Sequence, residues 1–148
     1  MSQNELFENV LKLEDFMRMG NNDNQEFTQM QKYVLTDILH TGNHGVAGES
    51  KQGAKYDERR GKTIYINPSD LRVGRGAVLI VLVGDEPCSE VVYNVEGLRW
   101  YCLHTTPYVD AVNRDGYVML RTINSVYKLK PMNFDETDTD YLRIMHLK

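Results

Sequence analysis

The feature that most constrains the fold is a series of short β-type segments between residues 62 and 131, separated by turn signals. The most apolar segment, residues 77–83, is rich in β-branched side chains and is typical of a central strand. Turn signals that recur about every 8–12 residues favour a small antiparallel β-barrel or a curled sheet over a parallel α/β sheet. Strands are expected at residues 63–66, 77–83, 90–95, 98–105 and 117–129, the last with a break at Asn124-Ser125.

The N-terminal part has a helical rather than a strand-like pattern. Ser2 and Glu5 have the spacing of a capping box, and apolar residues follow at positions 6, 10, 13 and 17. After Gly20, a second helix is predicted from about residue 25 to 41, with one apolar face formed by Phe27, Met30, Val34 and Ile38. The sequence therefore predicts an N-terminal helical hairpin over residues 1–42 and an α+β fold class. The apolar stripes of the two helices would also allow a homodimer.

Polar segments lie on both sides of the predicted β domain. Residues 42–61 contain five glycines and almost no apolar residues, which predicts a long polar loop. The segment 135–140 is acidic, and a short amphipathic end follows it. The expected organisation is a helical hairpin at 1–42, a flexible polar loop at 43–61, a small antiparallel β domain at 62–131 and an acidic C-terminal tail at 132–148.

Composition narrows the class of protein. The chain has 148 residues, a formal net charge of −4 and 41% hydrophobic residues, which are ordinary values for a globular protein. Its longest apolar run, residues 77–83, is far shorter than the ~20 residues of a membrane-spanning helix, and the first residues lack the pattern of a signal peptide. Cys88 and Cys102 can both be reduced core residues, although one bridge across a hairpin remains open. A cytoplasmic protein without membrane association is expected.

Three short motifs carry a resemblance. Residues 71–74 (LRVG), 89–92 (SEVV) and 120–129 (LRTINSVYKL) are similar to the corresponding parts of small SH3-like β-barrel proteins of phages and other mobile elements, which are uncharacterised. The Thr-x-Asn-Ser-x-Tyr ending resembles their last strand pair, where a one-turn break separates the strands. The resemblance covers about half of the chain and includes no catalytic residues. The resemblance implies a binding module that is encoded by a phage and acts in the host cytoplasm.

Candidate catalytic groups are few. Trp100, Cys102 and His104 alternate on one face of a predicted strand, and Asp85 follows the apolar segment at 77–83. A hydrolase that uses Cys102, His104 and Asp85 is one hypothesis. A partly buried strand face is the simpler interpretation, because parallel side chains on one strand do not converge on a common point. We predict no catalytic residues, no metal site and no cofactor.

Candidate binding residues form one local basic excess with interleaved aromatic residues. Arginine beside aromatic rings suits contact with phosphates or with an interface. Two carboxylates, Asp57 and Glu58, lie within this excess. Among the aromatic residues, Trp100, Tyr101 and Tyr108 are expected to be exposed. The predicted contact residues for protein or nucleic acid are Lys51, Lys55, Tyr56, Arg59, Arg60, Lys62, Arg72, Arg75, Trp100, Tyr101 and Tyr108.

The sequence thus favours a non-enzymatic binding protein that docks on a host protein or a protein–nucleic-acid complex. An inhibitor or regulator of a host defence system or of a nucleic-acid enzyme would fit this description. A nucleic-acid-binding protein that uses the basic region 51–75 is the first alternative, and a structural or virion component is the second.

Overall fold

The computed structural model of the chain describes residues 30–146, which are dominated by β-strands. Within this part, a short helix α2 follows β1, a 3-10 turn η2 follows β2, and helix α3 ends the described chain. The elements are β1 (Gln31–His40), α2 (Ala54–Arg59), β2 (Thr63–Ile66), η2 (Pro68–Asp70), β3 (Gly76–Leu82), β4 (Tyr93–Val95), β5 (Leu98–Arg114), β6 (Tyr117–Thr122), β7 (Ser125–Pro131) and α3 (Glu136–His146).

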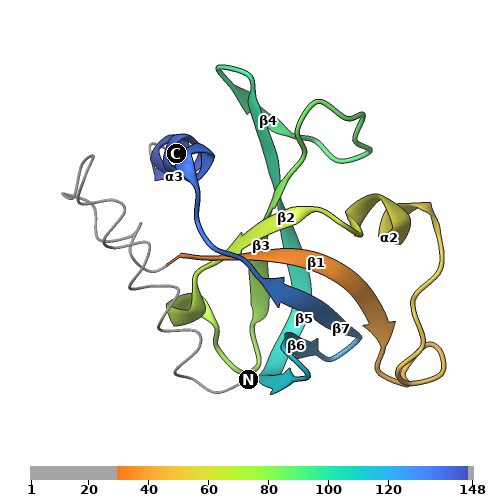
Figure 1. Cartoon of the computed structure of the whole chain (residues 1–148). Coiled ribbons are helices and arrows are strands. Elements are labelled where there is room, and N and C mark those ends of the chain that lie inside the picture. Colours follow the sequence, from red (N-terminus) through yellow and green to blue (C-terminus); the bar gives the residue numbers. More distant parts are fainter. Residues whose placement is uncertain (1–29, 147–148) are drawn as a thin grey trace.

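The strands form a closed antiparallel barrel (Figure 1). The order in the sheet is β3-β2-β1-β7-β6-β5-β4, and an additional pairing between β3 and β5 closes six of these strands into a ring. β4 lies outside the ring, in a hairpin with the start of β5. Strands of the ring pair with their neighbours along the chain, which is the up-and-down arrangement, and closure leaves no free sheet edge within the ring.

Side chains along each strand alternate between the inside and the outside of the barrel, and the inward set fills the interior. Ala77, Leu79 and Val81 of β3 are buried, and the residues between them are more exposed. β6 and β7 alternate in the same way, so one set of side chains enters the core and the other covers the outside of the barrel. The buried core comprises Tyr33, Leu35, Ile38, Ile64, Ile66, Ala77, Leu79, Val81, Val83, Tyr101, Leu103, Val118, Leu120, Tyr127 and Leu129.

Two-residue turns fix the register of two hairpins. Glu96-Gly97 joins β4 to β5, and Asp115-Gly116 joins β5 to β6, with positive φ at all four residues. Such turns match the right-handed twist of paired strands. Another glycine allows a close approach of two strands, because a Cβ at Gly76 would lie 2.5 Å from the carbonyl oxygen of Thr105. The sequence signals at 96–97 and 113–116 therefore lie where the chain turns.

The predicted second helix is wrong, and with it the α+β class and the helical hairpin. Residues 31–40 form β1, which pairs with both β2 and β7. A bulge between Leu35 and Asp37 inserts one residue into this strand. The core positions Leu35 and Ile38 are therefore three residues apart, a spacing that also occurs on one face of a helix. The first predicted helix, and residues 25–29 of the second, lie outside the described residues.

Helix α3 packs on the outside of the barrel. Leu142 is fully buried beside Tyr65, and partly buried side chains that include Ile80, Leu82 and Phe134 pack against them in a second apolar cluster. A buried ionic contact accompanies it, because the Lys32 ammonium lies 3.1 Å from a carboxylate oxygen of Asp138. The Tyr65 hydroxyl donates to the other oxygen of Asp138. Part of the predicted acidic tail is thus a packed helix. Across residues 30–146, no helix combines the length and the apolar character that a membrane crossing requires.

Candidate functional site

The basic residues that follow β1 are mostly held by carboxylates. The Arg60 guanidinium lies 2.9 Å from Asp37 and 2.7 Å from Asp57, and it also donates to the carbonyl of Lys51. Burial alone would raise the pKa of Asp37, but the hydrogen bonds from Ser50 and Arg60 outweigh it and lower the pKa below its usual value. Arg60 therefore clamps the segment that carries α2 to β1.

Two further cations attach this segment to the turn after β3. Lys62 forms an ion pair with Glu86, and Arg59 lies 3.9 Å from Glu90. Glu58 joins the same contact, since it accepts hydrogen bonds from the backbone and the hydroxyl of Ser89 and from the Cys88 thiol. These charged groups therefore connect the segment around α2 to the turn after β3.

The aromatic ring of Tyr56 lies among three cations. Lys51, Lys55 and Arg59 place their charged groups 5.4, 5.0 and 5.8 Å from the ring centre. Lys51 is buried, and Tyr56 packs against the barrel core. Within residues 51–62, Lys55 is thus the cation that is exposed and has no carboxylate partner among the described residues.

The other predicted contact residues are scattered. Arg72 and Arg75 are exposed, in the segment before β3, and the backbone of Arg75 pairs with half-buried Tyr108. Trp100 is 2% exposed and stacks on Tyr93 with ring centres 5.5 Å apart. Tyr101 belongs to the barrel core. The expectation that Trp100 and Tyr101 are exposed is therefore wrong, while the binding role of the whole set stays a prediction.

The hypothetical hydrolase set gains no support from the structure. Cys102 pairs with Ile80 and His104 pairs with Val78, whereas Asp85 lies beyond the far end of β3. Burial raises the pKa of the Cys102 thiol, which is the opposite of what activates a nucleophile. Both cysteines are free. Over residues 30–146, no three histidine, cysteine or carboxylate side chains gather in a way that could hold a metal ion.

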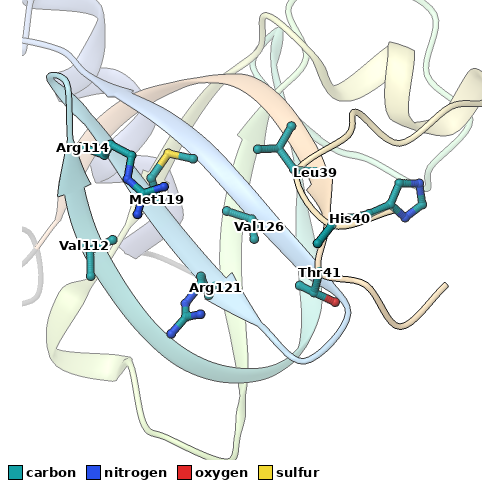
Figure 2. Close-up of a pocket in the computed structure, with 10 residues that line it drawn as sticks. Leu39, His40, Thr41, Val112, Arg114, Met119, Arg121 and Val126 are labelled. Atoms are coloured by element: carbon teal, nitrogen blue, oxygen red, sulfur yellow. The ribbon is translucent and has the colours of Figure 1, made fainter. Parts of the chain in front are cut away.

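A groove on the outside of the barrel brings apolar and cationic side chains together (Figure 2). We call it the outer groove. Its volume is about 410 Å³, within the usual range for ligand sites. It crosses β1, β7, β6 and β5, and a loop after β1 forms one wall. The lining residues are Leu39, His40, Thr41, Ala47, Gly48, Val112, Arg114, Met119, Arg121 and Val126.

The floor of the outer groove follows from strand alternation. Val126 pairs with Leu39 on one side and with Arg121 on the other, and Met119 pairs with Val112. The chain neighbours of Met119 and Val126 are buried in the core, so these two side chains face outward, and their cross-strand partners Val112 and Leu39 lie on the same face. Val112 is 40% exposed, and the other three apolar side chains are half-buried. The floor is an aliphatic surface open to the solvent.

The wall formed by residues 42–50 is bonded to β1. The backbone N–H of His40 donates to Glu49, and the N–H of Gly48 donates to His40, both at 2.8 Å. Asn43 donates to the carbonyl of Ile123 at 2.7 Å. A Cβ at Gly45 would lie 2.6 Å from Nδ1 of His40, so the loop backbone passes directly against the imidazole ring. This wall of the groove is therefore built into the fold.

Cations lie on the opposite side of the groove. Arg114 and Arg121 are on the β5–β6 side, across from Thr41 and His40 (Figure 2). Arg121 donates two hydrogen bonds to Asp110, which lower the pKa of that carboxyl. Arg114 is exposed and has no carboxylate partner among the described residues.

Two lysines of β7 extend this positive surface. Lys128 lies 4.3 Å above the ring of Tyr117, and Lys130 is exposed. Neither has a carboxylate partner within the described residues. Tyr117 lies directly across from Arg114 in the β5–β6 register. We call the outward side chains of Arg114, Tyr117, Arg121, Lys128 and Lys130 the basic face. In a chain of net charge −4, it is a local positive surface beside an aliphatic groove.

The basic face was missed in the sequence because its residues are dispersed along the chain. Alternation provides the one signal that could have found them. Residues 117–121 and 126–130 alternate strictly, and one set in each contains the core residues Leu120, Tyr127 and Leu129. The other set must then gather Lys128, Lys130 and Arg121 on one outer surface.

Comparison of the chain with models of protein families, with curated proteins and with solved structures found no significant match.

Proposed function

We propose that this chain is a non-enzymatic binding protein that docks on a partner protein through the basic face and the outer groove. The observation that carries the proposal is the position of Arg114 and Lys130. Both are exposed, both lack a carboxylate partner among the described residues, and Arg114 borders an aliphatic groove. Charged groups at the edge of an apolar surface fit the usual anatomy of an interface between proteins, which has an apolar centre and a polar rim.

The expected partner has an acidic surface around an apolar one. Complementary charge raises the rate of association and rejects partners of the same sign. The rest of this chain carries a net negative charge. An acidic partner would therefore be attracted to the basic face and oriented by it. An inhibitor or regulator of a larger protein or complex would act in this way, by occupying a surface of its target.

The test is affinity capture with charge-reversed baits. The double variant R114E/K130E removes the unpaired cations of the basic face. The control, K55E/R75E, changes the net charge by the same amount at two exposed cations of the contact set predicted from the sequence, so it also tests whether that set binds the partner. We expect wild type and control to capture the same protein, and R114E/K130E to bind the purified partner at least tenfold more weakly. Equal binding by all three baits would contradict the proposal.

Nucleic-acid binding is the second candidate, favoured by the combination of arginine, lysine and Tyr117 on one face. A salt titration with a 12-nucleotide oligothymidylate separates the two. If phosphates are the target, binding weakens steeply with salt, and R114E/K130E flattens that slope. If the partner is a protein, we expect no oligonucleotide binding at low salt.

A further inference from the structure

Three exposed parts of the described molecule differ in the chemistry that they offer to a partner. The open edge of β4 has only three strand residues, and it offers no charged group that would select an occupant. The end of the barrel near η2 exposes Val73 and Ile123, whose apolar side chains carry no charge that would specify an occupant. The outer groove combines a concave floor with cations on one side, so its chemistry specifies an occupant.

The size of the outer groove indicates a short segment of chain. It spans four neighbouring strands, hence three spacings of about 4.8 Å, or roughly 14 Å. An extended peptide covers that distance with about four residues. The wall at Ala47 and Gly48 bounds one end, and Arg114 lies at the other.

The side chains that line the outer groove determine which residue types a bound segment should contain. The floor consists of aliphatic side chains and Met119, which favours an aliphatic side chain as the anchor. Arg114 can donate two parallel hydrogen bonds to a carboxylate, while Arg121 already donates to Asp110. None of the residues that line the groove is a tyrosine, phenylalanine or tryptophan, so the floor offers no ring on which a base could stack.

We propose that the outer groove binds an extended acidic peptide segment of the partner, with an aliphatic side chain on Met119 and Val126 and a carboxylate on Arg114. This inference rests on the proposed function and specifies the part of the partner that is bound. The loop wall and the paired strands leave the groove open without rearrangement, so binding needs little ordering of this protein.

The experiment uses four fluorescent probes and the full chain. The first probe is the capped peptide Glu-Leu-Glu-Leu-Glu-Leu. The second replaces each glutamate with lysine, the third replaces each leucine with serine, and the fourth is the 12-nucleotide oligothymidylate. We expect the first peptide to bind in fluorescence anisotropy and each of the others to bind at least tenfold more weakly. Amide shifts in nuclear magnetic resonance should change at Met119, Val126 and Arg114.

Two matched pairs of variants locate the contact. Val112 lines the groove and Val78 lies outside it, with exposures of 40% and 43%. V112S should weaken peptide binding about threefold or more, and V78S should leave it unchanged. R114Q should weaken it about tenfold, and R114K should restore part of the loss because the charge returns without the planar fork.

The outcomes separate this inference from the function on which it rests. One outcome is that no peptide binds, while R114E/K130E still binds the purified partner more weakly than wild type does. The proposed docking function then stands, and the proposal that the groove binds an extended segment is wrong. If the oligonucleotide binds and the peptides do not, both are wrong. Peptide binding that V112S and V78S weaken equally would also overturn the groove as the site.

Discussion

The cations around α2 and the cations on the basic face differ in whether carboxylates surround them. Arg60 contacts Asp37 and Asp57, and its side chain is 22% exposed. Arg114 is exposed and has no carboxylate partner among the described residues. In the sequence the first region looks like the basic patch, because its cations are close together along the chain. In the structure the second region is the one with unpaired charge.

This difference shows that density of charge along a sequence does not measure charge available to a partner. A cation that already contacts carboxylates would have to break those contacts before it could bind another anion. Among the paired cations of the described residues, Lys32 has the most buried ion pair, with its ammonium 3.1 Å from Asp138 beneath α3. The comparison therefore predicts that paired cations control stability and unpaired cations control binding.

The largest effect is expected at the buried pair. Asp138→Ala leaves the Lys32 ammonium, whose side chain is 9% exposed, without its buried partner, and it removes the acceptor of the Tyr65 hydroxyl. Breaking such a pair from one side costs about 3 kcal/mol of unfolding free energy. Urea denaturation measures the loss. Asp140→Ala, at an exposed position of the same helix, should change stability by less than about 0.5 kcal/mol. Similar values for the two variants would show that the pair does not hold α3.

The next effect is expected at the clamp between α2 and β1. Arg60→Ala removes hydrogen bonds to Asp37, Asp57 and the carbonyl of Lys51, and we expect a loss of about 1–3 kcal/mol in urea denaturation. Lys55→Ala, which changes an exposed cation of the neighbouring helix α2, is the control. A loss no greater than that of the control would mean that the ion pairs of this region are weak, and the contrast with the basic face would disappear.

Acid should weaken the same clamp. The pKa of Asp37 is lower in the folded chain than its usual value, so this group stabilises the fold above its unfolded pKa. That stabilisation is lost as the pH falls through the lowered pKa, hence below about pH 4. Between pH 7 and pH 3, wild type should lose more stability than Arg60→Ala does. Equal losses would show that Arg60 is not the group that keeps Asp37 ionised.

The sequence predicted the positions of most strands, but it did not predict how the strands close into a ring. Alternation and turn residues located β2, β3, β6 and β7, because each signal acts within a few residues. Closure of the ring depends on β1, where a bulge changes the apolar spacing from two to three. Burial in this strand is decided by pairing with β2 and β7, which are distant in the sequence. No local pattern contains that information.

The candidate site was less predictable for the same reason. Arg114, Met119 and Val126 become neighbours only through the registers of β5, β6 and β7. Trp100 is predicted to be an exposed contact residue, on a strand face that it shares with Cys102 and His104. That face is not uniform along β5, since Trp100 is 2% exposed beneath Tyr93 whereas His104 is exposed. Exposure along one long strand depends on what covers each part of it.

The smallest effects on stability are expected on the basic face, and they give the sharpest test of the comparison. Arg121→Ala removes an exposed pair with Asp110, and such pairs contribute about 0.2–1 kcal/mol. Arg114→Ala removes no pair among the described residues, so its unfolding free energy should equal that of wild type within about 0.5 kcal/mol. Binding should show the reverse order, with the larger loss for Arg114→Ala, because Arg121 already donates to Asp110 and Arg114 is free to donate to a partner. Denaturation in urea and titration with the captured partner, on the same two variants, measure both orders. If Arg114→Ala lowers stability as much as Arg60→Ala does, the charge of Arg114 belongs to the fold, and the outer groove has no unpaired arginine left to offer a partner.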